Sequence, residues 1–243
     1  MYYQKLVSAV AALVLALAAP IATFATASRT DTNDKRDERV LAPLNIAILI
    51  QDDLISQVGN ELNLTREFIR SLPPGSRVMV GYVTSGSLQV RQPFTTDLDQ
   101  AARSLRIPVS NDMASPFNPY VEVIEALKHF DQGKGRNTML LISDGLDTSH
   151  GFDLSSAANS LDLQRAIKRA NESNVSVYTF YAPSVGLTSR SRIAANYGQG
   201  SLDRLADETG GKAFSQGTTG FVSFSPYFRR LRAALNEQIA LAY

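Results

Sequence analysis

The sequence contains no cysteine. This absence excludes disulfide bonds, thiol nucleophiles and the thiolate ligands of structural zinc sites. An exported protein without disulfides must take its stability from its hydrophobic core. With 243 residues, of which 44% are hydrophobic, the chain is long enough to bury such a core in one sizeable domain.

Motifs of enzymatic catalysis are also missing. The two histidines, His129 and His150, have no partner at the spacing of a metal-binding pair. There is no Gly-x-Ser-x-Gly nucleophile elbow, no Gly-x-x-x-x-Gly-Lys-Ser/Thr phosphate loop and no dinucleotide fingerprint after the first predicted strand. We therefore expect a protein that is not an enzyme, and no motif implies an organic cofactor.

The chain has no large excess of charge of either sign. Its 24 lysines and arginines face 23 aspartates and glutamates, for a formal net charge of +1. A balanced chain offers no broad basic surface for nucleic acid or anionic membranes. We therefore expect neither as a partner.

The N-terminal residues have the pattern of a secretory signal. Lys5 precedes an apolar run over residues 6–24, and residues 25–27, Ala-Thr-Ala, form a small-x-small cleavage site. We predict a signal peptide over residues 1–27, export to the periplasm or the medium, and no membrane insertion after cleavage. A retained anchor is the alternative, because the apolar run could nearly span a bilayer. Residues 28–43 contain many charged side chains, a composition that predicts a flexible spacer.

From residue 44 to residue 243 the pattern is that of one α/β domain. Strands are predicted at residues 44–50, 77–83, 88–91, 138–143, 175–181 and 212–214. Helices are predicted at residues 58–71, 98–105, 119–130, 160–172 and 201–208, and from Pro226 onward. This alternation predicts a doubly wound, mostly parallel six-stranded sheet with one antiparallel edge strand, at 88–91, and helices on both faces.

The most informative segment is residues 139–148, where an apolar run ends in two acids, Asp144 and Asp147. A buried parallel strand delivers such residues to the carboxyl edge of the sheet, where open α/β folds place their ligands. Their alternative role is to cap the turn that follows the strand.

Further oxygen-bearing side chains are predicted at the same edge. Asp52, Asp53 and Ser56 follow the first strand, and Ser115 precedes the helix predicted at residue 119. Carboxylate and hydroxyl oxygens are the ligands that Mg²⁺ prefers. Together with Asp144 and Asp147, these residues are the candidate metal ligands.

In order along the chain, these segments resemble those of a von Willebrand factor type A (VWA) domain, in particular of the secreted VWA-related proteins common in Acidobacteria. The resemblance covers residues 45–243. It rests on the first strand with its acids, on residues 66–75, on residues 139–148 and on residues 205–214 with their Thr-Gly-Gly segment. It implies the VWA fold and a function in protein binding or adhesion.

The resemblance also implies a metal-ion-dependent adhesion site, which in this family uses Asp-x-Ser-x-Ser, a threonine and a later aspartate. Asp144 matches the later aspartate, and the threonine position falls near Ser115 or Asn118. The first motif is degraded in both registers, whose ligand positions hold either Gln51, Asp53 and Ile55 or Asp52, Leu54 and Ser56. Because isoleucine and leucine cannot ligate Mg²⁺, at least one inner ligand is lost and the site is predicted to be degenerate.

Residues 180–201 form the longest connection predicted after a strand, and they lie at the same edge as the acids. Arg190, Arg192 and Tyr197 are of types enriched at protein interfaces. A connection of this length predicts a functional loop, and a plain solvated loop is the alternative.

Three hypotheses follow. The first is a secreted, non-enzymatic VWA-type module that binds another protein, of unknown identity, through the strand ends. The second is an adhesion domain that binds Mg²⁺ or Mn²⁺ with an altered ligand set. The third is a hydrolase whose metal is held by a cluster of four carboxylates, those of Asp52, Asp53, Asp144 and Asp147.

Overall fold

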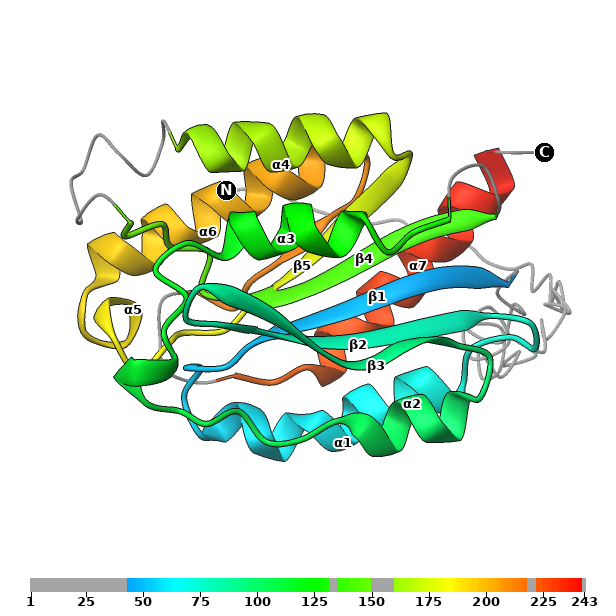
Figure 1. Ribbon diagram of the computed structural model, residues 1–243, viewed down its shortest axis with the longest axis horizontal. Coiled ribbons are helices and arrows are strands. Elements are labelled where there is room, and N and C mark those ends of the chain that lie inside the picture. Colours follow the sequence, from blue (N-terminus) through cyan, green and yellow to red (C-terminus); the bar gives the residue numbers. More distant parts are fainter. Residues whose placement is uncertain (1–42, 132–134, 150–159, 218–221, 242–243) are drawn as a thin grey trace, which may run out of the picture. The chain divides into compact units, whose positions relative to one another are not determined.

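The computed structural model describes residues 43–131, 135–149, 160–217 and 222–241, which all belong to the unit Asp37–Tyr243 (Figure 1). The predicted signal peptide and all of the predicted spacer except Pro43 lie outside the described residues. Among the helices of the described part of the chain, none has the length and apolarity needed to cross a bilayer.

Six strands form one sheet in the order β3-β2-β1-β4-β5-β6. β3 is antiparallel to β2, and the other neighbouring strands are parallel, so the predicted fold class and its antiparallel edge strand are confirmed. The long apolar runs of β1 and β4 are explained by their central positions, because helices cover both faces of these strands. The strands are β1 (Leu44–Gln51), β2 (Arg77–Thr84), β3 (Ser87–Thr95), β4 (Arg136–Ser143), β5 (Val175–Tyr181) and β6 (Ala213–Phe214).

Two helical layers enclose the sheet (Figure 1). One face packs against α1 (Gln57–Arg70), α2 (Leu98–Ser104) and α7 (Ser225–Leu241), which contribute Val58, Ala101 and Leu231 to one apolar cluster. The opposite face packs against α3 (Pro119–Leu127), α4 (Leu161–Glu172) and α6 (Arg192–Glu208), which contribute Val123, Leu163 and Leu202 to a second. A short helix, α5 (Leu187–Arg190), and a 3₁₀ turn (Asp112–Ala114) complete the described structure.

Side-chain caps set several helix starts where the sequence predicts them. Asp97 accepts a hydrogen bond from Gln100 N at 2.8 Å, and Ser160 accepts one from Leu163 N at 3.2 Å. Each cap satisfies a backbone donor that the first helical turn leaves unpaired.

The prediction of a long loop over residues 180–201 is wrong. β5 ends at Tyr181, α5 follows, and α6 begins at Arg192 with Ser191 as its cap. Gly198 and Gly200 obscure this helix in the sequence, because glycine is a poor helix former.

Close packing against the end of β4 requires a glycine at position 198 of α6. A Cβ atom at this position would lie 1.9 Å from Asp144 O, and one at Gly145 would lie 2.4 Å from Gly198 O. Gly145 also has a φ of +69°, which favours glycine. The two glycines therefore let α6 approach the end of β4 closely.

Candidate functional site

β1, β2, β4 and β5 end at one edge of the sheet, which we call the C-terminal edge. Here backbone hydrogen bonds join the loop after β1 to the loop after β5: Ile55 N donates to Pro183 O at 3.0 Å, and Val185 N donates to Asp53 O at 2.9 Å. The acids that follow β1 are thereby fixed beside the start of α5.

The side chain of Gln51, at the end of β1, connects the ends of β1 and β4. Its Nε2 donates to Asp53 Oδ1 at 2.7 Å. Its Oε1 accepts hydrogen bonds from Ser143 Oγ at 2.5 Å and from Asp144 N at 3.2 Å. Both ends of the amide are therefore used, and its oxygen faces hydrogen-bond donors of β4.

Asp144 lies at the centre of this edge and is only 4% exposed. Its Oδ1 accepts a hydrogen bond from Leu146 N at 3.1 Å, and its Oδ2 accepts one from Thr188 Oγ1 at 3.0 Å. Burial raises the pKa of this carboxyl, and these hydrogen bonds oppose the rise only in part.

Asp53 is a second buried carboxyl, 1% exposed. Burial, followed by the charge of Asp144, raises the pKa of Asp53 to about 6, while hydrogen bonds from Gln51 and Ser115 lower it. Within the described part of the chain, neither Asp53 nor Asp144 has a lysine or arginine partner. The two acids thus form an acid pair without a matching cation.

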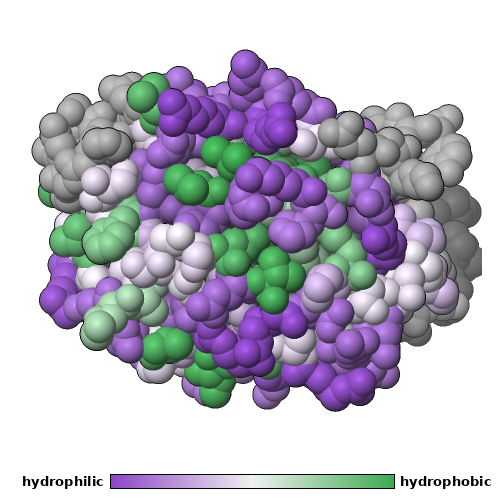
Figure 2. Space-filling view, in the orientation of Figure 1, coloured by the Kyte–Doolittle hydropathy of each residue, from purple (hydrophilic) through white to green (hydrophobic). Residues whose placement is uncertain are grey.

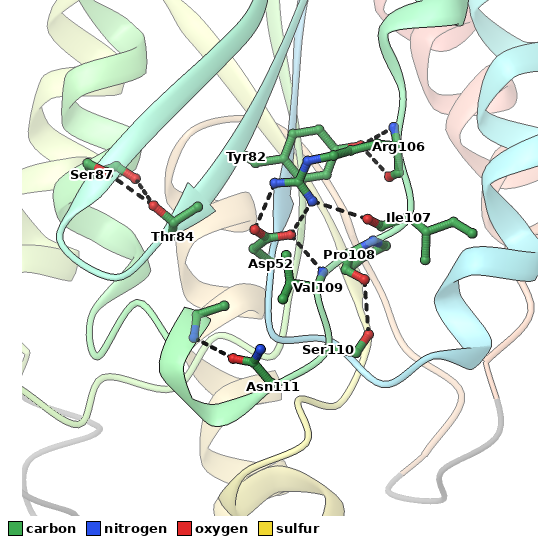
Figure 3. A network of polar contacts seen from close by, with 11 residues as sticks. Asp52, Tyr82, Thr84, Ser87, Arg106, Ile107, Pro108, Val109, Ser110 and Asn111 are labelled. Atoms are coloured by element: carbon green, nitrogen blue, oxygen red, sulfur yellow. Dashed lines mark hydrogen bonds and ion pairs between the residues drawn. The ribbon is translucent and has the colours of Figure 1, made fainter.

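Asp52, next in the chain to Asp53, belongs to a different network (Figure 3). Both of its carboxylate oxygens accept hydrogen bonds from Arg106, at 2.5 and 2.7 Å, and Oδ1 also accepts one from Val109 N at 3.0 Å. The hydrogen bond that Arg106 donates to Asp52 raises the pKa of Arg106. Asp52 therefore anchors the α2–α3 loop, and both of its oxygens are engaged by Arg106, so its place among the predicted metal ligands stays a prediction.

Tyr82 of β2 completes this network, which we call the Arg106 clamp (Asp52, Tyr82 and Arg106). The tyrosine hydroxyl donates to Arg106 O at 2.5 Å and accepts from Arg106 N at 2.7 Å. The guanidinium lies 4.0 Å from the centre of the tyrosine ring. The clamp fixes the start of the loop that carries residues 107–117.

Two other predicted ligands also lie apart from the acid pair. Ser56 is exposed at the start of α1 and makes no side-chain cap. Asp147 accepts hydrogen bonds from Ser149 Oγ and Ser160 Oγ, both at 2.6 Å. It therefore connects Ser149 to Ser160, the N-cap of α4, and the predicted cluster of four carboxylates is not assembled among the described residues.

A cavity of about 290 Å³ opens at the C-terminal edge. Gln51 and Asp144 line its buried end. Asp112, Ser115, Phe117, Leu187 and Arg190 line it from the α2–α3 loop and from α5.

The oxygen atoms that could ligate a metal at this cavity are not arranged to fit a divalent cation. In one register of the first adhesion-site motif, Gln51 and Ile55 occupy two of the ligand positions. Gln51 presents its N–H₂ group to Asp53, and the side chain of Ile55 has no atom that can ligate a metal. Both oxygens of Asp144 already accept hydrogen bonds. Of the described residues, no three histidines, cysteines, aspartates or glutamates gather as a metal-binding group. Asp53, Ser115 and Asp144 do lie together, as predicted, and metal binding there remains a prediction.

Sequence reasoning missed three residues of the site. Thr188 donates to Asp144, and Ser184 N donates to Thr188 Oγ1 at 2.8 Å. Asp112 lines the cavity from the 3₁₀ turn. Ser184 and Thr188 lie in the segment wrongly predicted as a loop, and a four-residue helix gives too little periodicity to reveal it.

The three residues predicted to bind a partner differ in their exposure and in their relation to the cavity. Arg190 is exposed and lines the cavity, as a partner-binding role requires. Arg192 is exposed at the start of α6, and Tyr197 is half-buried within the same helix. Neither of these two lines the cavity.

Exposed apolar side chains also gather at the C-terminal edge. The described residues expose eight large hydrophobic side chains, and Met113 is exposed by 90%. Four lie in the α2–α3 loop, and four lie in the first turns of α3, α4, α5 and α6, which all begin at this edge. Figure 2 shows green, apolar groups at the left of the view, the side where Figure 1 places α5, and further ones over the centre of the same face. The eight are Ile107, Val109, Met113, Phe117, Val121, Leu161, Leu187 and Ile193.

No protein-family model and no curated protein matches the sequence. Among solved structures, the conserved hypothetical protein BatB from Bacteroides thetaiotaomicron aligns with a TM-score of 0.56 and 12% identity, over 82% of this chain and 100% of its own. An aerotolerance-related membrane protein from Bacteroides fragilis aligns with a TM-score of 0.54 and 13% identity, over 80% and 99% of the two chains. The SpRpn10 VWA domain aligns with a TM-score of 0.45 and 15% identity, over 81% and 95%.

Identities this low establish a likeness in fold alone. The sheet order, the two helical layers and the likeness to the two Bacteroides proteins agree with the fold predicted from the sequence. The chain therefore has a VWA-like, doubly wound α/β fold.

Proposed function

We propose that this protein is an exported, non-enzymatic VWA-type module for protein binding or adhesion, and that it binds its partner through the C-terminal edge. The observation that carries the proposal is the one-sided distribution of exposed apolar side chains. All eight of those exposed by the described residues lie at this edge.

Exposed apolar groups that gather around a polar centre are typical of interaction sites. Phe117 and Leu187 line the cavity itself, beside Asp112 and Arg190. The Arg106 clamp holds the α2–α3 loop in place, so half of the apolar side chains are presented on a fixed backbone. A preformed surface of this kind loses little conformational entropy on binding.

The arrangement of the carboxylates supports a role without catalysis. A metal-dependent hydrolase needs its acids together around the metal. Here Asp52 binds Arg106, and Asp147 binds Ser149 and Ser160. Only Asp53 and Asp144 remain close to one another.

Affinity capture with matched variants tests the proposal. The double variant Phe117→Ser/Leu187→Ser removes two exposed apolar side chains and is expected to change the free energy of unfolding by less than about 0.5 kcal/mol. The control, Asp131→Asn/Lys212→Ser, changes two exposed residues at the opposite edge. We expect a protein captured from the source cells by wild type and by the control to be lost with the apolar-edge variant. Identical capture by all three proteins contradicts the proposal.

A further inference from the structure

The chemistry of the cavity indicates what kind of partner group it accepts, if the proposed function holds. Asp144 lines its buried end, and Asp53 lies close enough for its pKa to respond to the charge of Asp144. Removing carboxylates from water is unfavourable unless a positive group, sufficient hydrogen bonds or uptake of a proton compensates the charge. The described part of the chain provides hydrogen bonds to both acids and an ion-pair partner to neither.

The adjacent acid shows how this chain compensates a buried carboxylate when it does so internally. Asp52 receives the complete guanidinium of Arg106 at 2.5 and 2.7 Å. Asp53 receives the neutral amide of Gln51 instead, and Asp144 receives the neutral donors Leu146 N and Thr188 Oγ1. A cation supplied by another molecule would therefore find charge complementarity at Asp53 and Asp144 that is absent at Asp52.

The size of the cavity and its surroundings limit the form of that cation. At about 290 Å³ the cavity lies at the lower end of ligand pockets, which span about 300–1,000 Å³, so it suits one long side chain better than a cofactor. Phe117 and Leu187 are exposed by 59% and 43% beside it, and can contact the apolar stem of that side chain and its neighbours.

We propose that the partner is a protein segment that inserts a lysine or arginine side chain into this cavity, toward Asp144, with apolar residues beside it in contact with Phe117 and Leu187. Asp112, at the cavity wall, adds negative charge to the path of entry. Arg190, which lines the same cavity, is the chain's own positive charge there and opposes entry of a second one.

The sign of the charge makes the proposal testable without knowledge of the natural partner. A library of random displayed peptides is selected against the full chain in EDTA, and the affinity of the enriched peptides is then measured by fluorescence polarisation. We expect enriched sequences with a central lysine or arginine between apolar residues. Replacing that residue with glutamine in the peptide should weaken binding by at least about tenfold.

Variants of the protein provide the complementary test. Asp144→Asn should weaken binding of the basic peptide by at least about tenfold. Asp112→Asn, at an exposed position, should weaken binding less. Arg190→Gln, also at an exposed position, should strengthen binding of the basic peptide by about two- to threefold. Asp131→Asn, an equivalent change at the opposite edge, should leave the affinity unchanged. If Asp144→Asn fails to fold, the opposite signs of the Asp112 and Arg190 effects decide the question.

The outcomes separate this inference from the proposed function. Enriched peptides that lack a basic residue would overturn the inference. So would acidic peptides whose binding is weakened by Arg190→Gln. Either result would leave the proposal of a protein-binding edge in place. Enrichment that appears only when Mg²⁺ replaces EDTA also overturns it. If no peptide is enriched and no protein is captured by the C-terminal edge, both proposals fail.

Discussion

The two edges of the sheet use the same types of charged residue in opposite ways. At the edge where the parallel strands begin, Arg77 pairs with Asp131, and the two side chains are 35% and 58% exposed. At the C-terminal edge, the Asp52 side chain is 4% exposed in its pair with Arg106, and Asp53 and Asp144 are buried without a cation. The Arg77–Asp131 pair is solvated, whereas the C-terminal edge combines buried charge with exposed apolar groups. This reversal of ordinary burial is the basis for our proposal that the C-terminal edge is an interaction site.

The largest expected difference between the edges concerns their ion pairs. Arg106→Gln leaves Asp52 buried without its cation, which should lower the free energy of unfolding by about 3 kcal/mol. Arg77→Gln, the matched change at the opposite edge, should cost less than about 1 kcal/mol because that pair is solvated. Urea unfolding of the two variants measures both values. Equal losses would show that the clamp contributes no more than an ordinary surface ion pair.

A smaller effect of opposite sign is expected at the acid pair. The pKa of Asp53 is raised from 3.8 to about 6 in the folded protein, so its charged form opposes folding. Asp53→Asn removes this charge and should increase the free energy of unfolding by about 1–3 kcal/mol above pH 7.

The pH dependence of the Asp53→Asn effect checks its cause. Because the folded pKa is the higher one, the stability contributed by protonated Asp53 is complete below about pH 4 and is lost as the pH rises through about 6. The advantage of the variant should therefore be full above pH 7 and disappear near pH 4, as measured by urea unfolding across that range. An advantage independent of pH would assign the effect to packing instead of charge.

The central strands could be predicted from the sequence because their environment is uniform. β4 lies between β1 and β5 and is buried along most of its length, so its apolar run and the acid after it identify the C-terminal edge directly. Ser160 and Asp97 likewise give local caps that define helix starts.

The contacts of the site could not be predicted, because they join residues far apart in the chain. Asp52 and Asp53 are equivalent in sequence, and the choice between them depends on Arg106, 54 positions beyond Asp52. Thr188 reaches Asp144 from α5, across 44 positions. The exposed apolar side chains of the C-terminal edge also could not be predicted from the sequence, because the eight residues belong to one loop and four different helices.

The most direct test of this account is a calorimetric titration of the full chain with Mg²⁺ and Mn²⁺. In the proposed function, a protein partner supplies the cation that compensates Asp53 and Asp144, and Gln51 and Ile55 occupy ligand positions from which they do not bind a metal. We therefore predict no saturable heat at millimolar metal, for wild type and for Asp144→Ala alike. Saturable binding to wild type that is lost in Asp144→Ala would contradict this prediction and would favour the metal-dependent adhesion domain.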